Sequence, residues 1–219
     1  MNSFIEVKEL IDQYNEMMVK SQNIAFFARG IEIQKNEIEN LLNYDQYLEK
    51  IKKEFISAKK EKAANWIFCL QYGAKAIYHE LSMIVYLKED KMSEAWGNLI
   101  EAQHLTEIVI QNHPIDGDDL LGYKSRLHAY EITLFPKMMF SSYGGIVKIS
   151  ECSICGKDYN ECDHIKGKLY VGEMCCRIIK EVDLEEISIV ENPADKRNRI
   201  LTNTDKDGNT IDILTLRKQ

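Results

Sequence analysis

The residues best suited to chemistry are three cysteines and one histidine within a single short stretch, Cys152, Cys155, Cys162 and His164. The first two cysteines have the C-x2-C spacing and are followed by Gly156, whose freedom to adopt a positive φ allows a tight turn that aims both sulfurs at one point. Three thiolates and one imidazole suit tetrahedral zinc better than a hard cation. Because four protein ligands leave no open position for water, the sequence predicts a structural Zn2+ site.

Two further cysteines, Cys175 and Cys176, follow this cluster. Neighbouring side chains in an extended segment point to opposite sides, so only one of the two can face the metal. We expect both to be small buried residues beside the site, with Cys175 as the alternative ligand in place of Cys162 or His164. The competing interpretation is a loop of reduced, unligated thiols.

The composition is that of an ordinary globular chain, with 219 residues, 45% hydrophobic and 29% charged. We find no apolar run long enough to span a membrane and no basic, apolar leader, so we expect a cytoplasmic protein without membrane contact. Five of the 6 cysteines surround one loop, which favours metal binding in a reducing compartment over a disulfide framework.

Apolar residues recur at three- and four-residue steps through most of the first 140 residues. This periodicity predicts helices over 3–29, 31–58, 61–88, 93–111 and 119–140. Short connections between long amphipathic helices imply an antiparallel bundle, which we assign to a first domain over 1–141. Near the end of the first helix, Met17 and Met18 with Phe26 and Phe27 form either part of the core or a partner-binding face.

The helical periodicity stops at 141–145, and we interpret the sequence Ser-Ser-Tyr-Gly-Gly there as a linker. Short β-type segments follow over 146–149, 168–171, 175–179 and 187–190, and Asp207-Gly208 predicts a hairpin between 200–204 and 210–216. We therefore expect an α+β protein whose second domain, 142–219, is a small antiparallel β module. A module of this size buries little apolar surface and is therefore only marginally stable, and a bound zinc ion would add to its stability.

Two short stretches of the sequence resemble segments of known protein families. The C-x-H pair of Cys162 and His164 resembles the end of SWIM-type zinc fingers, which bind zinc and contact protein or nucleic acid, although that family opens with C-x-C rather than C-x2-C. The stretch Glu186-Ile-Ser-Ile-Val190-Glu-Asn-Pro193-Ala194 is similar to the strand and turn near the end of phage prohead proteases, but no matching histidine and serine segments precede it. Helices followed by a zinc-containing β module also look like bacterial and phage or mobile-element proteins.

We weigh three functions. The first is a non-catalytic zinc-binding interaction protein, in which the helical bundle contacts a protein partner or builds a homo-oligomer. The second is a nucleic-acid-binding regulator or phage-defence component, because zinc knuckles commonly contact DNA or RNA. The net charge of -7 opposes that function unless basic residues are segregated into a patch. The candidates for such a patch are Lys157, Lys166, Lys168, Lys196, Arg197 and Arg199.

The third function is an enzyme whose site is assembled from dispersed residues in a cleft between the two domains. Its candidate residues lie on the fifth predicted helix and are Tyr123, His128, Tyr130 and Glu131. Glu101 and His104 have the E-x-x-H spacing of di-metal bundles, but the companion motif is missing. Since no local catalytic motif accompanies these residues, the interaction protein is the preferred interpretation.

Overall fold

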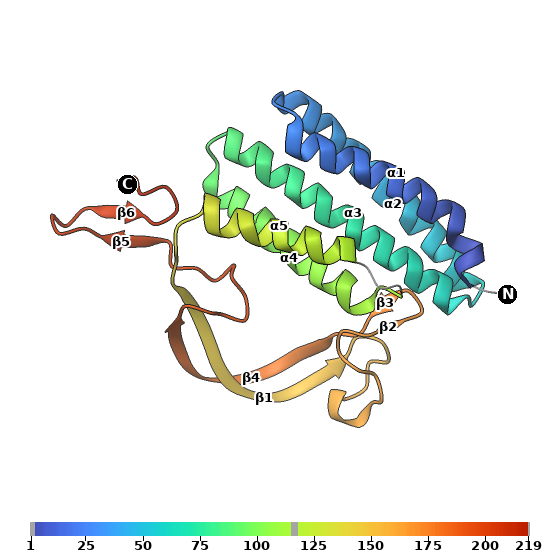
Figure 1. Cartoon of the computed structure of the whole chain (residues 1–219). Helices are drawn as coiled ribbons and strands as arrows, with labels where there is room; N and C mark the ends of the chain where they lie inside the picture. The colour runs from blue at the N-terminus through green and yellow to red at the C-terminus, as the bar shows by residue number, and fades with distance from the viewer. Residues whose placement is uncertain (1–2, 115–117, 219) are drawn as a thin grey trace.

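The computed structural model describes residues 3–114 and 118–218, and within them five α-helices are followed by short and long β-strands (Figure 1). The helices are α1 (Ser3–Phe27), α2 (Ile31–Ser57), α3 (Glu61–Lys88), α4 (Met92–Asn112) and α5 (Asp118–Leu134). The remaining elements are β1 (Phe140–Cys152), the 3-10 helix η1 (Tyr159–Glu161), β2 (Leu169–Tyr170), β3 (Glu173–Met174), β4 (Arg177–Val190), β5 (Thr202–Thr204) and β6 (Thr210–Asp212). The predicted α+β class is confirmed.

Helix α3 forms the centre of the bundle, between α1 and α2 on one side and α4 on the other (Figure 1). It is apolar around most of its circumference, which is typical of a helix surrounded by others. Ile67, Leu81 and Met83 have no measurable exposure. Of the methionines and phenylalanines near the end of α1, Met18 is buried in the core, whereas Phe26 and Phe27 are exposed. The core interpretation is therefore wrong for the two phenylalanines.

Helix α5 is shorter than predicted, and the expected linker is part of a strand. Pro136 follows the end of α5 closely, and its ring and missing N–H prevent the helix from continuing to residue 140. Gly144 and Gly145 lie within β1, where a Cβ on Gly145 would come within 2.4 Å of the Asp183 carbonyl oxygen. These glycines allow the close approach of β4 rather than a flexible connection. The predicted division into two domains at this point stays a prediction.

Strands β1 and β4 pair antiparallel over almost their whole length and form a long curved ribbon, which we call the β1–β4 ribbon (Figure 1). The segments 175–179 and 187–190 were predicted as separate strands, and residues 177–179 and 187–190 form the two ends of the single strand β4, while Cys175 and Cys176 precede it. The pairing register shifts at three places, and such bulges increase twist and curvature. The predicted hairpin around Gly208, which has φ +83, is confirmed as β5 and β6.

The ribbon is attached to the helices at two separated places. At one end, Phe140 stacks on Trp96 with ring centroids 6.2 Å apart, and the Trp96 indole N–H donates to the Lys196 carbonyl at 3.0 Å. At the other end, Leu169 and Met174 of the β2–β3 hairpin pack against a cluster contributed by α3 and α4. Trp96 lies near the start of α4, and Asn112, which donates to the Gly167 carbonyl, is its last residue. The two attachments therefore lie near opposite ends of this helix.

The first attachment predicts a specific effect of changes at Trp96. Trp96→Phe keeps a ring in the cluster but leaves the part-buried Lys196 carbonyl without its donor, which we expect to lower the free energy of unfolding by about 0.5–1.5 kcal/mol. Trp96→Ala also opens a cavity and is expected to cost about 3–5 kcal/mol. Urea unfolding of both variants measures these losses. A Trp96→Phe variant as stable as the parent would show that this hydrogen bond does not hold the segment.

Candidate metal centre

The four predicted ligands come together at the end of the β1–β4 ribbon. The ligand atoms of Cys152, Cys155, Cys162 and His164 all lie within 4.8 Å of one another. Cys152 is the last residue of β1, Cys155 lies in the following turn, and η1 directly precedes Cys162. The sequence reasoning therefore identified a group of side chains that the fold does bring to one point.

A tight turn aims the first two sulfurs. The Gly156 N–H donates to the Cys152 carbonyl at 2.9 Å, and Gly156 adopts a φ of +70 that favours glycine. Burial opposes ionisation of Cys152, but the backbone N–H groups of Cys155 and Ile154 point at its sulfur and lower the pKa of this thiol to about 6. A sulfur ionised near neutral pH is in the form that binds metal.

His164 has a ring nitrogen whose surroundings favour a role as a metal ligand. Its Nδ1 is buried and has no hydrogen-bond partner among the described residues. Its ring lies edge-on to Tyr170, with centroids 4.6 Å apart. Buried imidazole nitrogens are normally paired, because an unpaired one loses the hydrogen bonds it makes in water. A metal ion bound by the three sulfurs would complete the coordination of this nitrogen.

The two remaining cysteines of the region differ in position. Cys175 is fully buried, and its sulfur lies 3.8 Å from that of Cys152. That separation equals the edge of a tetrahedron, about 3.8 Å, that follows from a Zn–S bond of about 2.3 Å. Burial, followed by the neighbouring Cys152, raises the pKa of Cys175 to about 11. Cys176 is exposed, so the expectation that both are buried is wrong for it.

The loops around the cluster are fixed by contacts that do not involve a metal. The hydroxyl groups of Tyr170 and Tyr159 accept hydrogen bonds from the backbone N–H groups of Ile165 and Lys166 at 2.9 and 3.0 Å. The Gly172 N–H donates to Asn65 of α3 at 2.7 Å. The four candidate ligands, Cys152, Cys155, Cys162 and His164, lie in one loop that these contacts fix to the helices. Together they can bind a metal ion and leave no open coordination position.

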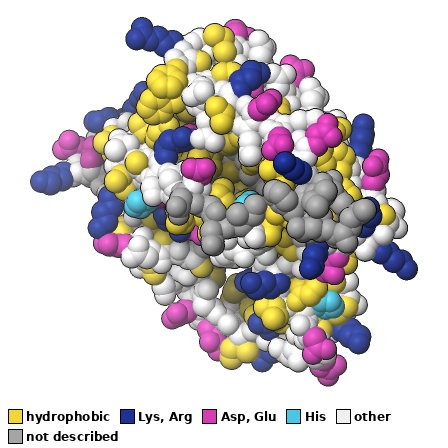
Figure 2. Space-filling model, turned by 45° about the vertical axis from the view of Figure 1, so that its right-hand side comes forward, with side chains coloured by type: hydrophobic (Ala, Val, Ile, Leu, Met, Phe, Trp, Pro, Cys, Tyr) yellow, Lys and Arg dark blue, Asp and Glu magenta, His cyan; other side chains and the backbone are white. Residues whose placement is uncertain are grey.

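The basic residues predicted for nucleic acid fall into two groups at opposite ends of the ribbon. Lys157, Lys166 and Lys168 are exposed near the metal cluster. In the second group, Lys196 pairs with Glu131 at 2.6 Å and Arg197 pairs with Asp195 and Glu101. On the face drawn in Figure 2, Lys and Arg side chains are interspersed with Asp and Glu. The nucleic-acid interface stays a prediction.

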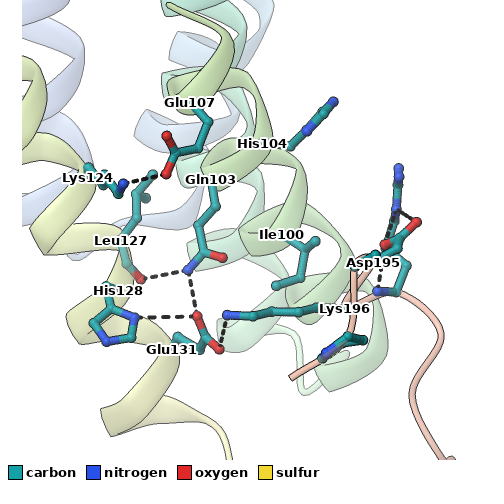
Figure 3. A pocket seen from close by; sticks show the side chains of 13 residues that line it. Ile100, Gln103, His104, Glu107, Lys124, Leu127, His128, Glu131, Asp195 and Lys196 are labelled. Atoms are coloured by element: carbon teal, nitrogen blue, oxygen red, sulfur yellow. Dashed lines mark hydrogen bonds and ion pairs between the residues drawn. The ribbon is translucent and has the colours of Figure 1, made fainter. Parts of the chain in front are cut away.

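The residues proposed for an enzyme are divided between two environments. His128 and Glu131 line a pocket of about 380 Å³ between α4, α5 and the segment 193–197 (Figure 3). Tyr123 and Tyr130 lie instead beside the buried Glu80, and burial followed by this carboxylate raises the pKa of both tyrosines. His104 lines the pocket from α4, while Glu101 of the same E-x-x-H spacing pairs with Arg197.

The charged side chains of this pocket are largely paired with one another. Gln103 and Lys196 donate to the Glu131 carboxylate at 2.9 and 2.6 Å, as Figure 3 shows. Burial alone would raise the pKa of Glu131, but these hydrogen bonds outweigh it and lower the pKa. Glu107 pairs with Lys124 across the pocket. Sequence reasoning missed the pocket as a unit, because the segment 193–197 is far along the chain from α4 and α5.

Comparison of the chain with models of known protein families, with curated proteins and with solved structures finds no match. A search of the described helices for a stretch of sufficient length and apolar character to cross a bilayer finds none.

The geometry predicts which cysteines bind the metal. We expect Cys155→Ser to lower the affinity for Zn2+ or Co2+ by about 100-fold or more, since removal of a residue that only supports a ligand already costs about 10- to 100-fold. Cys176→Ser is the matched control, because this thiol is exposed and outside the group of four. Titration with Co2+, followed through its thiolate charge-transfer absorption, measures both. Equal binding by the two variants would contradict the assignment.

Proposed function

We propose that this chain is a non-catalytic interaction protein in which a structural zinc ion holds the β1–β4 ribbon in place for contact with another protein surface. The observation that carries the proposal is the position of the four ligands. Cys152 ends β1, while Cys175, whose sulfur contacts that of Cys152, lies two residues before β4 begins. A metal bound there closes the loop of residues 152–164 at the end of the ribbon farthest from Trp96, beside the Cys175 sulfur.

The low stability of an isolated ribbon explains why a bound metal ion would be needed. A two-stranded antiparallel ribbon is marginal in water, because it has no second layer against which to bury side chains. Three thiolates and one imidazole suit Zn2+, and zinc affinity contributes directly to the stability of the segment that it organises. The closed set of four protein ligands favours this structural role over a catalytic one.

The ribbon also displays the kind of surface that partners contact. The residues paired across it at Tyr143 and Ile187, and at Ser141 and Ile189, belong to one face, together with Leu184. The exposed fractions are 57% for Tyr143, 66% for Leu184, 68% for Ile187 and 66% for Ile189. Scattered apolar residues are normal on a surface, but a contiguous group of this kind marks an interaction site.

We expect association with protein to depend on both the metal and this face. Tagged wild-type protein, Cys155→Ser, Cys176→Ser and the double variant Leu184→Ser/Ile187→Ser are recovered from cells after nuclease treatment, and proteins bound near stoichiometry, including untagged copies of this chain, are quantified. Wild type and Cys176→Ser should retain the same partner, and the other two should lose most of it.

Two results would contradict the proposal. One is an equal yield of bound protein from all four variants, which would place the contact elsewhere. The other is recovery of nucleic acid, before nuclease treatment, that disappears on replacing Lys157, Lys166 and Lys168 by Gln. That second result would support the alternative function, nucleic-acid binding.

A further inference from the structure

We infer that the partner of the ribbon is a second copy of this chain, paired antiparallel through the free edge of β4. The two ribbons would then form one four-stranded sheet in the order β1-β4-β4-β1 around a two-fold axis. This inference rests on the proposed interaction function and specifies its partner. It follows from three properties of the ribbon, namely its free edge, its apolar face and the distribution of charge along β4.

The two outer edges of the ribbon differ in how they are covered. The outer edge of β1 is occupied near its start, where the Ser141 N–H donates to the Asn198 carbonyl at 2.8 Å. It is occupied again at its end, where the Cys152 N–H donates to the Lys157 carbonyl at 2.9 Å. Along β4, no backbone group pairs with any described residue other than those of β1. An edge of 14 residues is therefore free to accept a strand.

The apolar face gives a reason for that edge to be used. Phe140 and Val190, which are paired at the bundle end of the ribbon, pack into the helical core. Their neighbours in the pleat, Ser141 and Ile189, point to the opposite face, away from the helices. The exposed Leu184 and Ile187 share this outer face and lie on β4 itself. Pairing through β4 would place the two apolar rows side by side in one wider sheet.

The charges along β4 are arranged so that the strand complements itself when reversed. Its first part carries the basic residues Arg177 and Lys180, and the part that follows carries four carboxylates. Asp183 pairs with Lys148 of β1, whereas Glu181, Glu185 and Glu186 have no ion pair among the described residues. Lys180 pairs with Glu151 of its own ribbon at 3.0 Å, and in the dimer it would exchange or share that partner. In an antiparallel pair, the basic part of one β4 lies beside the acidic part of the other. Opposite charges across strands stabilise pairing, and like charges oppose it.

A charge-exchange experiment on the zinc-loaded full chain tests this arrangement. Sedimentation equilibrium should show a reversible dimer. The double variant Glu185→Lys/Glu186→Lys places like charges together in both symmetry-related halves, so we expect it to weaken the dimer by about tenfold or more. Adding Lys180→Glu to that variant should restore most of the affinity. Adding Lys206→Glu instead of Lys180→Glu, on the exposed turn between β5 and β6, changes the net charge by the same amount and should not restore the affinity.

Amide hydrogen exchange supplies a second readout, since β4 amides should become protected as protein concentration rises. A zinc-loaded chain that stays monomeric at all concentrations would overturn the inference. A dimer whose affinity is the same in the wild type and in the charge variants would also overturn the inference, because another surface would then be responsible for dimerisation. If a different protein protects the β4 amides while the chain alone remains monomeric, the second copy is the wrong partner and the proposed interaction function stands.

Discussion

A two-stranded ribbon cannot bury its own side chains, and this constraint organises the second half of the molecule. The ribbon depends on attachments at both ends, since it has no second layer along its length. At one end, the Trp96 indole and the Phe140 ring fix it to the start of α4. At the other end, the β2–β3 hairpin docks on α3 and α4, and the Cys–His cluster lies between that docking point and the strands.

The helical bundle supplies what the ribbon lacks, a large core with few exposed faces. Helix α3 is buried along most of its length, so the helices have a packed core to which the ribbon is attached. The Glu131 carboxylate of α5 accepts hydrogen bonds from both Gln103 of α4 and Lys196, and so joins the helices to the segment that follows the ribbon. The bundle therefore positions the ribbon, while the ribbon carries the free edge and the apolar face.

Features encoded by local sequence were predictable. The limits of α3 follow from periodicity alone, and the four candidate ligands follow from their spacing, because short-range patterns determine both. Features that depend on distant residues were not. The Gly144–Gly145 pair has the composition of a linker, and only the close approach of Asp183 on β4 explains it as strand. The position of Cys175 against Cys152 likewise depends on two segments 23 residues apart.

We propose that Cys152, Cys155, Cys162 and His164 hold one structural zinc ion at the end of the ribbon. The most direct test is the metal content of native protein purified without chelator, combined with X-ray absorption at the zinc edge. We expect one zinc per chain, coordinated by three sulfurs and a single nitrogen, and no bound water. Protein that contains no metal, or zinc bound mainly by oxygen, would contradict it and would require the clustered thiols to be explained by redox chemistry.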